Sequence, residues 1–315
     1  MNNYVFIAAL VLFMGCKQSD RTEYIVAEKD LIPEGIAYSK STDSFYLTSI
    51  YKSKIIEIDR VTGKQKDFIS EKEYGFLPGE GIYIDDERSL LHAVGGYFRL
   101  QDSLTSLFTF DLDSRELIRR VDIVDGKDHF LNDLVMDKEG NLYITDTKGS
   151  AVYFLPSGGD SLSLFYQSTE IQYPNGIAIS DDNTKLFIAS FRKGVRSLDI
   201  EHKQILSKAD TTGVSHGIDG LEFYNGNLYA IQNGVQGNPH SFRKLILNAD
   251  QSEVVGLEVI DDNHERLNLP LTFCIVNNQA VVIGNSNLQY LNQTDFTLDK
   301  PDSLKSTKLL IYCPK

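Results

Sequence analysis

Four oxygen-bearing side chains, each at the start of a short apolar run, are the residues of this sequence best suited to chemistry. They are Glu34, Asn132, Asn175 and Asp219. Two carboxylates and two amides supply hard oxygen ligands, which suit a divalent cation such as calcium. The set contains no cysteine and no pair of histidines, which argues against a structural zinc site. Each residue alone could instead serve a turn, because Asn, Asp and Gly favour turns for local reasons.

These side chains belong to a pattern that repeats six times. Each repeat has a turn, a run of apolar alternation, a turn rich in Gly, Asp or Asn, and a second apolar run, which predicts paired β-strands. The repeats open at Pro33, Gly79, Leu131, Pro174, Ile218 and Pro270. We take as equivalent the residue that follows the opening dipeptide of each repeat. The spacings between successive members are 46, 53, 42, 44 and 53 positions. These residues are Gly35, Gly81, Leu134, Gly176, Gly220 and Phe273.

This spacing leaves room for four short strands in each repeat. Further strand candidates lie between the repeats, at 54–58, 106–112, 151–154, 194–200 and 242–247, and no long window has helical periodicity. The sequence therefore predicts an all-β fold, a single six-bladed β-propeller over residues 30–315, with an irregular β-sandwich as the alternative. The segments 23–27 and 308–312 also have strand character and are expected to complete one blade together, which closes the ring.

Residues that open the innermost strands of a propeller converge on one mouth of its tunnel. We therefore expect the four oxygen ligands to meet there and to hold one divalent cation, calcium first, with magnesium, manganese or zinc as alternatives. Glu80 occupies the aligned position in the second repeat. It is a candidate general base or outer acid, and the alternative is a tunnel-lining group bonded to water.

Four further residues near this mouth are candidates for supporting roles. His129 and His216 precede Asn132 and Asp219 by three positions and are candidate catalytic proton shuttles, with solvated loop histidines as the alternative. Asp146 and Asn233 end strands that return to the mouth, and we expect them to orient the ligands from behind.

The pattern Glu34-Gly35, Asn132-Asp133, Pro174-Asn175-Gly176 and Asp219-Gly220 resembles the senescence-marker-protein/gluconolactonase family, whose relatives include paraoxonases and diisopropylfluorophosphatases. The resemblance covers nearly the whole chain after the amino terminus. It implies a calcium-dependent six-bladed propeller that hydrolyses lactones, aryl esters or organophosphates. It also implies that the four residues hold one catalytic cation and that Asp219 acts, in addition, as general base or nucleophile.

Two positions depart from the pattern of that family. Leu134 stands where the motif commonly has Gly, and Phe130 stands where it commonly has Arg, two positions before Asn132. Without this arginine, the resemblance does not extend to recognition of a sugar-acid lactone.

The amino terminus predicts export and lipidation. Residues 4–14 form an uninterrupted apolar stretch, which is too short to span a bilayer but has the length of a signal-peptide core. The following Gly15-Cys16 and the polar residues after it resemble a lipoprotein cleavage site. We expect residues 1–15 to be a lipoprotein signal peptide, Cys16 to carry the lipid and 16–29 to be a tether. The protein would then be anchored in the bacterial cell envelope. The alternatives are a plain secretory signal or an apolar strand.

Charge and cysteine content restrict the partners. The chain carries 31 Lys and Arg against 44 Asp and Glu, a formal net charge of −13, and has no basic run. Binding to nucleic acid is therefore disfavoured, and membrane contact is expected through the lipid alone. Cys274 and Cys313 could form a disulfide or remain two thiols. Acidic pairs such as Asp85-Asp86 and Asp181-Asp182 are expected at solvated hairpin tips.

The sequence as a whole predicts a metal-dependent hydrolase of a lactone or ester, acting on a small molecule. One alternative is a tethered, calcium-stabilised propeller that binds a small ligand or a protein partner without turnover. Another is a relative of the strictosidine-synthase-like propellers. Specificity is expected to come from loops between blades, such as 95–106 and 234–241. The sequence leaves the oligomeric state open.

Overall fold

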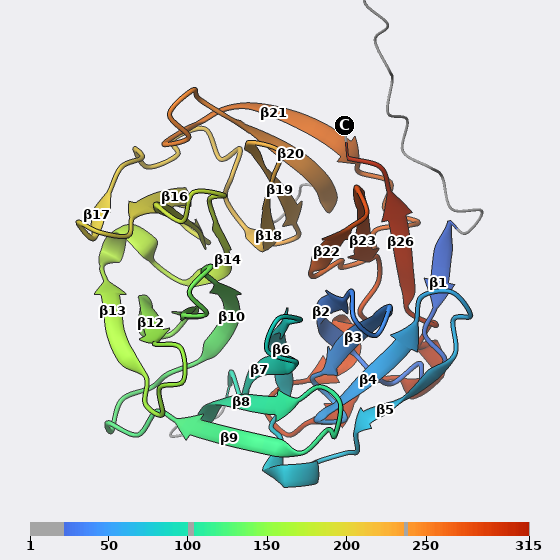
Figure 1. The fold of residues 1–315 in the computed structure, drawn as a ribbon. Helices are drawn as coiled ribbons and strands as arrows, with labels where there is room; N and C mark the ends of the chain where they lie inside the picture. The colour runs from blue at the N-terminus through green and yellow to red at the C-terminus, as the bar shows by residue number, and fades with distance from the viewer. Residues whose placement is uncertain (1–21, 100–103, 236–238, 315) are drawn as a thin grey trace, which may run out of the picture.

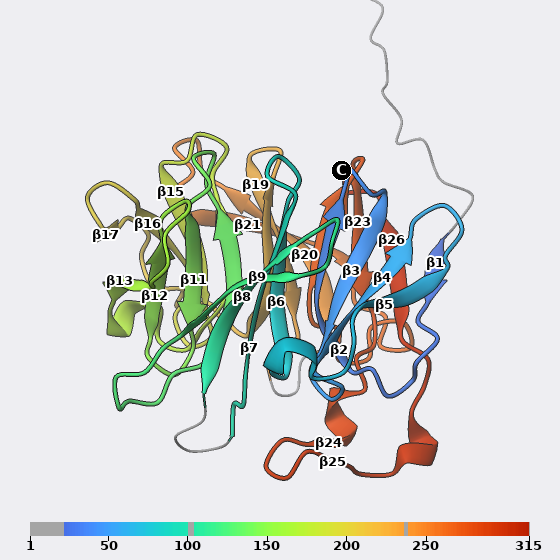
Figure 2. The same cartoon turned by 60° about the horizontal axis from the view of Figure 1, so that its bottom comes forward.

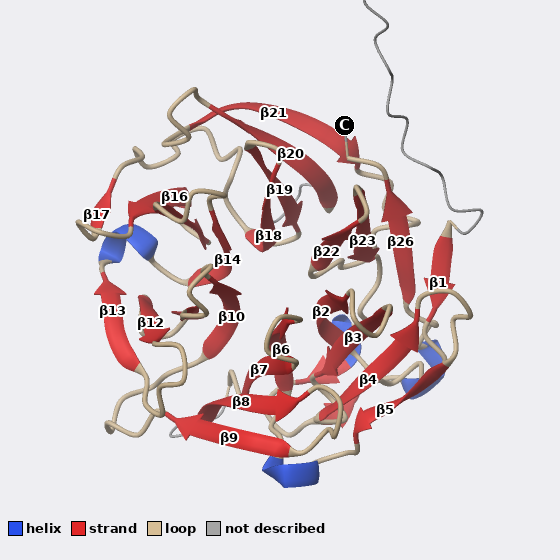
Figure 3. Ribbon diagram, viewed as in Figure 1, coloured by secondary structure: helices blue, strands red, loops and turns tan. Residues whose placement is uncertain are grey.

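The computed structural model describes residues 22–99, 104–235 and 239–314 of the chain. Its strands form six four-stranded antiparallel sheets that stand around a central axis, together with one small two-stranded sheet (Figure 1). In the described part of the chain, helical structure is limited to four single 3-10 turns, η1 (Glu73–Gly75), η2 (Thr169–Ile171), η3 (Leu288–Tyr290) and η4 (Pro301–Ser303) (Figure 3). The predicted all-β, six-bladed propeller is confirmed.

The first three blades follow one another along the chain, and each runs from its innermost to its outermost strand. Blade one consists of β2 (Pro33–Ser39), β3 (Ser44–Ser49), β4 (Lys54–Asp59) and β5 (Gln65–Ile69). Blade two consists of β6 (Gly79–Asp85), β7 (Leu90–Gly96), β8 (Thr105–Asp111) and β9 (Leu117–Asp122). Blade three consists of β10 (Leu131–Met136), β11 (Leu142–Asp146), β12 (Ala151–Leu155) and β13 (Ser163–Gln167).

The remaining blades keep this order except at the end of the ring. Blade four consists of β14 (Pro174–Ile179), β15 (Lys185–Ser190), β16 (Gly194–Asp199) and β17 (Gln204–Ile205). Blade five consists of β18 (Ile218–Tyr224), β19 (Asn227–Gln232), β20 (Ser241–Leu247) and β21 (Val254–Asp261). Blade six combines β22 (Phe273–Val276), β23 (Gln279–Ile283), β26 (Lys308–Tyr312) and β1 (Glu23–Ile25).

Blade six closes the ring with strands from both ends of the described chain. The strand β1 pairs antiparallel with β26, with Glu23 opposite Leu310. This confirms the predicted joint blade and leaves few open strand edges. Cys274 is buried in β22 and Cys313 is exposed after β26, and they form no disulfide with each other.

The hydrophobic core is divided among the junctions between blades. Each of six clusters of buried residues combines side chains from two neighbouring blades. Between blades one and two, for example, Tyr46 and Phe68 pack edge to face at 5.3 Å, and Phe68 meets Phe110 at 6.1 Å. Burial of each large apolar side chain contributes about 1.5–3 kcal/mol, so the blades hold one another in place.

Five inner strands share one irregularity near their first residue. The pairing shifts between Pro33 and Ile36 in β2, and the same shift occurs at the start of β6, β10, β14 and β18. This common bulge fixes the repeat register. It also corrects the sequence alignment, because Asp133 is the equivalent of Gly35 and Leu134 lies one position later. In blade six, Leu271 lines the mouth as Glu34 does, so Thr272 corresponds to Gly35 and Phe273 lies one position later.

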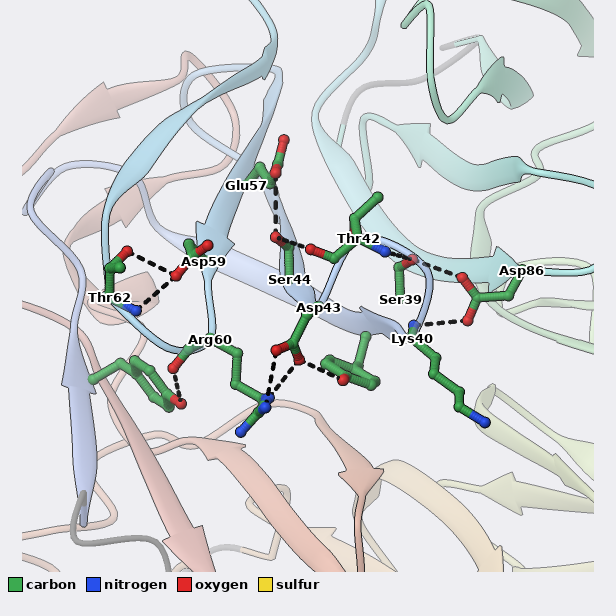
Figure 4. A network of polar contacts seen from close by, with 12 residues as sticks. Ser39, Lys40, Thr42, Asp43, Ser44, Glu57, Asp59, Arg60, Thr62 and Asp86 are labelled. Atoms are coloured by element: carbon green, nitrogen blue, oxygen red, sulfur yellow. Dashed lines mark hydrogen bonds and ion pairs between the residues drawn. The ribbon is translucent and has the colours of Figure 1, made fainter.

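The acidic hairpin tips are not all solvated, as the contacts between the turns of blades one and two show (Figure 4). Asp86, in the turn of blade two, accepts hydrogen bonds from the Ser39 hydroxyl at 2.6 Å and the Lys40 amide at 2.8 Å. Asp43 accepts two hydrogen bonds from Arg60. Asp85 is buried and pairs with Arg88. The expectation of solvated tips is therefore wrong for Asp85 and Asp86, because these carboxylates satisfy backbone and side-chain donors of their turns.

The bridge from Asp86 to blade one predicts a measurable loss of stability. Replacing Asp86→Ala is expected to lower the free energy of unfolding by about 1–2 kcal/mol, since it leaves several donors without their charged acceptor. Burial alone would raise the pKa of Asp86, but the hydrogen bonds that its carboxylate accepts outweigh burial, so the pKa is lowered. The difference from the wild type is therefore present above the ordinary aspartate pKa and shrinks as the pH falls toward 3.

Urea unfolding at pH 7 and pH 3 measures this effect. The control is Asp181→Ala in the exposed turn of blade four, which should change stability by less than about 0.5 kcal/mol. Equal stabilities of the Asp86→Ala variant and the wild type at pH 7 would contradict the assignment of this contact.

Candidate functional site

The structure brings the four predicted ligands and Glu80 to one mouth of the tunnel. Each is the second residue of an inner strand, within the shared bulge, and all five line the same cavity of about 440 Å³. Four of the side chains are buried and that of Asn175 is half-buried. The sixth blade places Leu271 at the equivalent position, so one side of this floor is apolar.

The inner strands approach one another closely at this level. A Cβ atom on Gly35 would lie 2.4 Å from the backbone oxygen of Glu80, and one on Gly176 would lie 2.2 Å from that of Asp219. Only glycine fits at such an approach. Glycine follows four of the five site residues, all except Asn132, and lets the neighbouring blade come near enough for its own site residue to face the same space.

The chain turns sharply before three of these strands. Ile32, Tyr173 and Leu269 have φ angles of 47°, 51° and 56°, and each directly precedes a proline. A left-handed conformation is unfavourable for such residues and persists where the surrounding structure enforces it. In blades one and four this turn sets the direction from which Glu34 and Asn175 enter the mouth.

Two of the predicted ligands have an oxygen that lacks a hydrogen-bond partner. Glu34 Oε2 and Asn132 Oδ1 are buried and accept no hydrogen bond in the described structure. A buried polar atom without a partner costs about 1–3 kcal/mol, so a positive group at this point would offset a real deficit. Hard oxygens in this state fit a divalent cation. Among the described residues, no group of three or more His, Cys, Asp and Glu side chains is arranged as a metal site, so any such site needs the amides.

Asp219 is held by two asparagines. Asn233 Nδ2 donates to Asp219 Oδ2 at 2.5 Å and to the Pro270 carbonyl at 2.7 Å, and Asn175 also donates to Asp219. Burial raises the pKa of Asp219 to about 6, and these hydrogen bonds act in the opposite direction. Asn233 is thus in direct contact with Asp219, as a residue that orients the Asp219 carboxylate must be.

The remaining two acids of the mouth have raised pKa values as well. Burial raises the pKa of Glu34 well above its ordinary value, and the nearby charges of Glu80 and Asp219 add to this effect. Burial followed by the charge of Asp219 does the same for Glu80. Three acids in a small buried space repel one another, and a bound cation would relieve this repulsion.

His129 lies behind the mouth and is not among the residues that line the cavity. Its Nδ1 contacts Asp146 Oδ2 at 2.5 Å and its Nε2 contacts Asp125 Oδ1 at 2.9 Å. Burial lowers the pKa of His129, but the two carboxylates outweigh it and the net direction is upward. Asp146 also accepts from the backbone amides of Phe130 and Gly149. This network fixes the loop that leads into Asn132.

His216 is half-buried and also lies outside the cavity lining. Its Nε2 donates to the backbone oxygen of Asp210 at 2.9 Å. The carbonyl of His216 accepts from Gln232. The structure therefore places both histidines beside the chain segments that enter the mouth, not in the cavity with Asp219.

The wall above the polar floor is mostly apolar, and the sequence reasoning named few of its members. It is lined by side chains from several blade connections, namely Ile50, Phe98, Phe130, Tyr173, Phe191, Leu271, Leu288 and Phe296. Of the two loops expected to set specificity, the first contributes Gly96, Phe98 and Arg99. The positions just before the inner strands, such as Phe130 and Tyr173, could have been found from the repeat register.

A hairpin inserted in blade six supplies the other part of the wall. The strands β24 (Leu291–Asn292) and β25 (Thr297–Leu298) project on one side of the ring (Figure 2). Leu291 packs with Ile32 and Ile50 of blade one, and Phe296 meets Tyr97 of blade two at 4.8 Å. The hairpin thus spans from blade six toward blades one and two. In the part of the chain that the structure describes, the other repeats have no such hairpin, so the repeat pattern did not predict it.

A second pair of acids lies farther along the inner strands. Asp133 and Glu222 face a small cavity of about 50 Å³ in the tunnel. Asp133 accepts from the amides of Leu134 and Ile177. Burial raises the pKa of Asp133 to about 7, and burial together with the charge of Asp133 raises that of Glu222 to about 8.

Comparison with known protein families identifies the class of this protein. The model of the SMP-30/gluconolactonase/LRE-like region matches residues 32–223, and the chain therefore belongs to this family. The resemblance inferred from the sequence is confirmed. A comparison with curated proteins gives no significant match.

Solved structures with the same fold cover nearly the whole chain. A protein described as calcium-binding, regucalcin from Agrobacterium tumefaciens, is 15% identical, with 93% of this chain and 96% of that chain covered and a TM-score of 0.62. A luciferin-regenerating enzyme is 18% identical, with 92% of each chain covered and a TM-score of 0.59. The PQQ-bound aldose sugar dehydrogenase of Streptomyces coelicolor is 12% identical, with coverage of 93% and 97% and a TM-score of 0.61. At these identities the likeness shows the fold alone.

The half-buried acid Glu222, whose pKa is raised, predicts the pH dependence of the metal-free protein. Its pKa is higher in the folded state than in the unfolded chain, so its contribution to stability is complete below the unfolded value of about 4.5 and is lost as the pH rises through about 8. Replacing Glu222→Gln should remove part of this loss and stabilise the protein at pH 9 relative to pH 5 by about 1–3 kcal/mol.

Chemical unfolding in the presence of chelator, at pH 5 and pH 9, measures the difference. Glu258→Gln on the outer strand β21 is the matched control, because its side chain is exposed in the folded state and should not change the slope. The prediction is contradicted if the wild type and the Glu222→Gln protein lose the same amount of stability between pH 5 and pH 9.

Proposed function

We propose that the protein is a metal-dependent hydrolase of a lactone or ester, with one divalent cation, calcium first, at the mouth of the tunnel. The observation that carries the proposal is the pair of buried oxygens without partners, on Glu34 and Asn132, in the floor of a cavity that also contains Asp219. Membership in the gluconolactonase family supports the reaction class. The calcium-binding description of the regucalcin structure supports the choice of ion.

The side chains that would hold the cation are Glu34, Asn132, Asn175 and Asp219. When bound, the cation supplies positive charge that polarises a carbonyl oxygen. The largely apolar wall lowers the local polarity above the floor, which strengthens charge interactions there. Asn233 donates a hydrogen bond to Oδ2 of Asp219 and so fixes the orientation of this carboxylate.

Asp219 would serve as the proton acceptor for the attacking water. In that step the water oxygen forms a bond to the carbonyl carbon, the water proton moves to Asp219, and the bond to the leaving oxygen breaks with uptake of a proton by the alcohol. In the alternative route, the Asp219 carboxylate attacks the carbonyl carbon to form an acyl anhydride, and the bond to the leaving oxygen breaks as that oxygen takes a proton from water. The resulting hydroxide then cleaves the anhydride, which releases the acid and regenerates the Asp219 carboxylate. Both routes need Asp219 ionised. A cation held beside this carboxylate would favour its ionised form.

The first test measures hydrolysis of a panel of lactones and aryl esters with added calcium and with chelator. We expect turnover that chelator removes and calcium restores. Asp219→Asn keeps an oxygen ligand but cannot accept the proton, so kcat should fall at least about 100-fold while calcium still raises the melting temperature. Asp262→Asn, in an exposed surface loop, is the matched control and should keep full activity.

Other results of this experiment would decide between the functions. Calcium-dependent stabilisation with no turnover on the panel would overturn the hydrolase proposal in favour of a binding propeller that captures a small ligand or protein partner. Equal activity of Asp219→Asn and the wild type would remove Asp219 from its role.

We also propose that the protein is anchored in the bacterial envelope through a lipid on Cys16. The signal peptide 1–15 and Cys16 lie outside the described residues, so the support is the sequence pattern alone. Within the described residues, no helix is long and apolar enough to cross a membrane. Two acyl chains or more on one cysteine are sufficient for stable attachment.

The lipid anchor predicts a specific labelling result. The full chain expressed in a bacterial host should incorporate labelled palmitate and fractionate with membranes, and Cys16→Ala should lose both properties. Cys313→Ala, which removes the exposed cysteine near the carboxyl terminus, is the control and should keep the label. Label retained in the Cys16→Ala protein would overturn the proposal.

A further inference from the structure

The wall of the mouth is rich in aromatic rings. Phe98 meets Phe130 edge to face at 5.0 Å, and Phe296 from the blade-six hairpin also lines the cavity. Tyr173 and Phe191 are 39% and 40% exposed although they are large apolar residues. Exposed aromatic side chains around a cavity mark a place where an apolar ligand is buried.

Polar groups are scarce between the floor and the rim of this cavity. Of the described lining above the oxygen floor, the uncharged polar side chains are Thr147, Gln293 and Tyr173, whose hydroxyl is one polar atom on a large ring. Thr147 already donates its hydroxyl to the Pro174 carbonyl. A ligand with many hydroxyl groups would therefore lose its contacts with water and find few replacements, which costs affinity. A flat or long apolar group has no such cost.

The rim carries two positive charges without acidic partners. Arg192 lies over the Tyr173 ring at 5.0 Å, and Arg99 lies near the Phe98 ring at 5.9 Å. Both are exposed and line the cavity, and neither forms an ion pair with any residue that the structure describes. Six other arginines of the described chain have acidic partners, namely Arg60, Arg88, Arg115, Arg120, Arg196 and Arg266. Arg119 and Arg243 form no ion pair with a described residue either, but neither lines the cavity.

The positive rim contrasts with the charge of the protein as a whole. The chain has a formal net charge of −13, so acidic groups are available to pair with arginine over most of its surface. Two guanidinium groups with no acidic partner among the described residues form a local positive rim at the cavity with the oxygen floor. Such a rim attracts anions and binds a carboxylate with two parallel hydrogen bonds.

We propose that the mouth selects an ester or lactone with a large aromatic or acyl group that bears a carboxylate at the end away from the scissile carbonyl. The carbonyl lies at the oxygen floor, the apolar part lies against the aromatic wall, and the carboxylate meets Arg99 and Arg192 at the rim. A cavity of about 440 Å³ is within the usual range for a ligand of this size. This inference rests on the proposed hydrolysis and names its substrate class.

A pair of esters that differ only in charge tests the inference. The anionic probe is 6-acetoxy-2-naphthoate and the neutral probe is its methyl ester, both used with the full chain and calcium. The measured quantity is the ratio of kcat/KM for the anionic probe to that for the neutral one, compared between proteins, so that the intrinsic reactivity of each ester cancels. The wild type should show a ratio about tenfold higher than the double variant Arg99→Gln/Arg192→Gln.

The control variant is Lys40→Gln. It removes one positive charge from an exposed hairpin turn of blade one, away from the cavity lining, and should keep the wild-type ratio (Figure 4). Arg192→Lys keeps the charge but loses the planar fork, and its ratio should lie between those of the wild type and the double variant. A change in the Lys40→Gln protein equal to that in the double variant would show an effect of net charge alone and overturn the inference.

Binding of the reaction products separates this inference from the proposed hydrolysis. Calorimetry with 6-hydroxy-2-naphthoate and with 2-naphthol needs no turnover, and the carboxylate should bind about tenfold more tightly to the wild type but not to the double variant. Arginine-dependent binding without hydrolysis would overturn the hydrolase and support the inference. Hydrolysis with the same ratio in all variants would overturn the inference and leave the hydrolase intact, and absence of binding by both naphthols would also overturn the inference.

Discussion

The close approach of the inner strands is the constraint on which the rest of this structure depends. Where Gly35 and Gly176 follow a site residue, a side chain of any size would collide with the backbone of the next blade. Because glycine stands there, neighbouring strands come together around the axis, and the shared bulge directs the preceding side chain into the mouth. The ring closure by β1 and β26 holds this arrangement, since an open ring would let the first and last blades separate.

That crowding also defines the chemistry of the mouth. Three acids and two amides share a buried floor, and burial makes their charged forms costly, which is why the pKa values of Glu34, Glu80 and Asp219 are raised. The unsatisfied oxygens of Glu34 and Asn132 mean that the protein alone does not complete this floor. The apolar wall and the two rim arginines surround it with a different chemistry. A ligand that complements all three layers has a polar, an apolar and an anionic part.

Much of the fold and part of the site could be predicted because they follow from local and repeated features. The six opening turns predicted the blades, and the strand character of 23–27 and 308–312 predicted the closing pair. The shared register predicted that Glu34 and Asp219 meet. Where the local signal was ambiguous, the alignment shifted by one position, at Asp133 and Thr272, since their repeats lack the glycine of the others. Asp86 was assigned to solvent because its partners come from a neighbouring blade, 45 to 47 residues earlier.

By itself, the sequence determined the all-β class, the number of blades and the identity of the residues at the mouth, because strand period and turn chemistry are written in neighbouring positions. Only the tertiary structure decided what surrounds them. The aromatic wall combines side chains from separate blade connections, including a hairpin inserted in blade six. The histidines are turned to Asp146 and Asp210 outside the cavity. The contact between residues far apart in the chain depends on how the blades pack, and no local pattern encodes that packing.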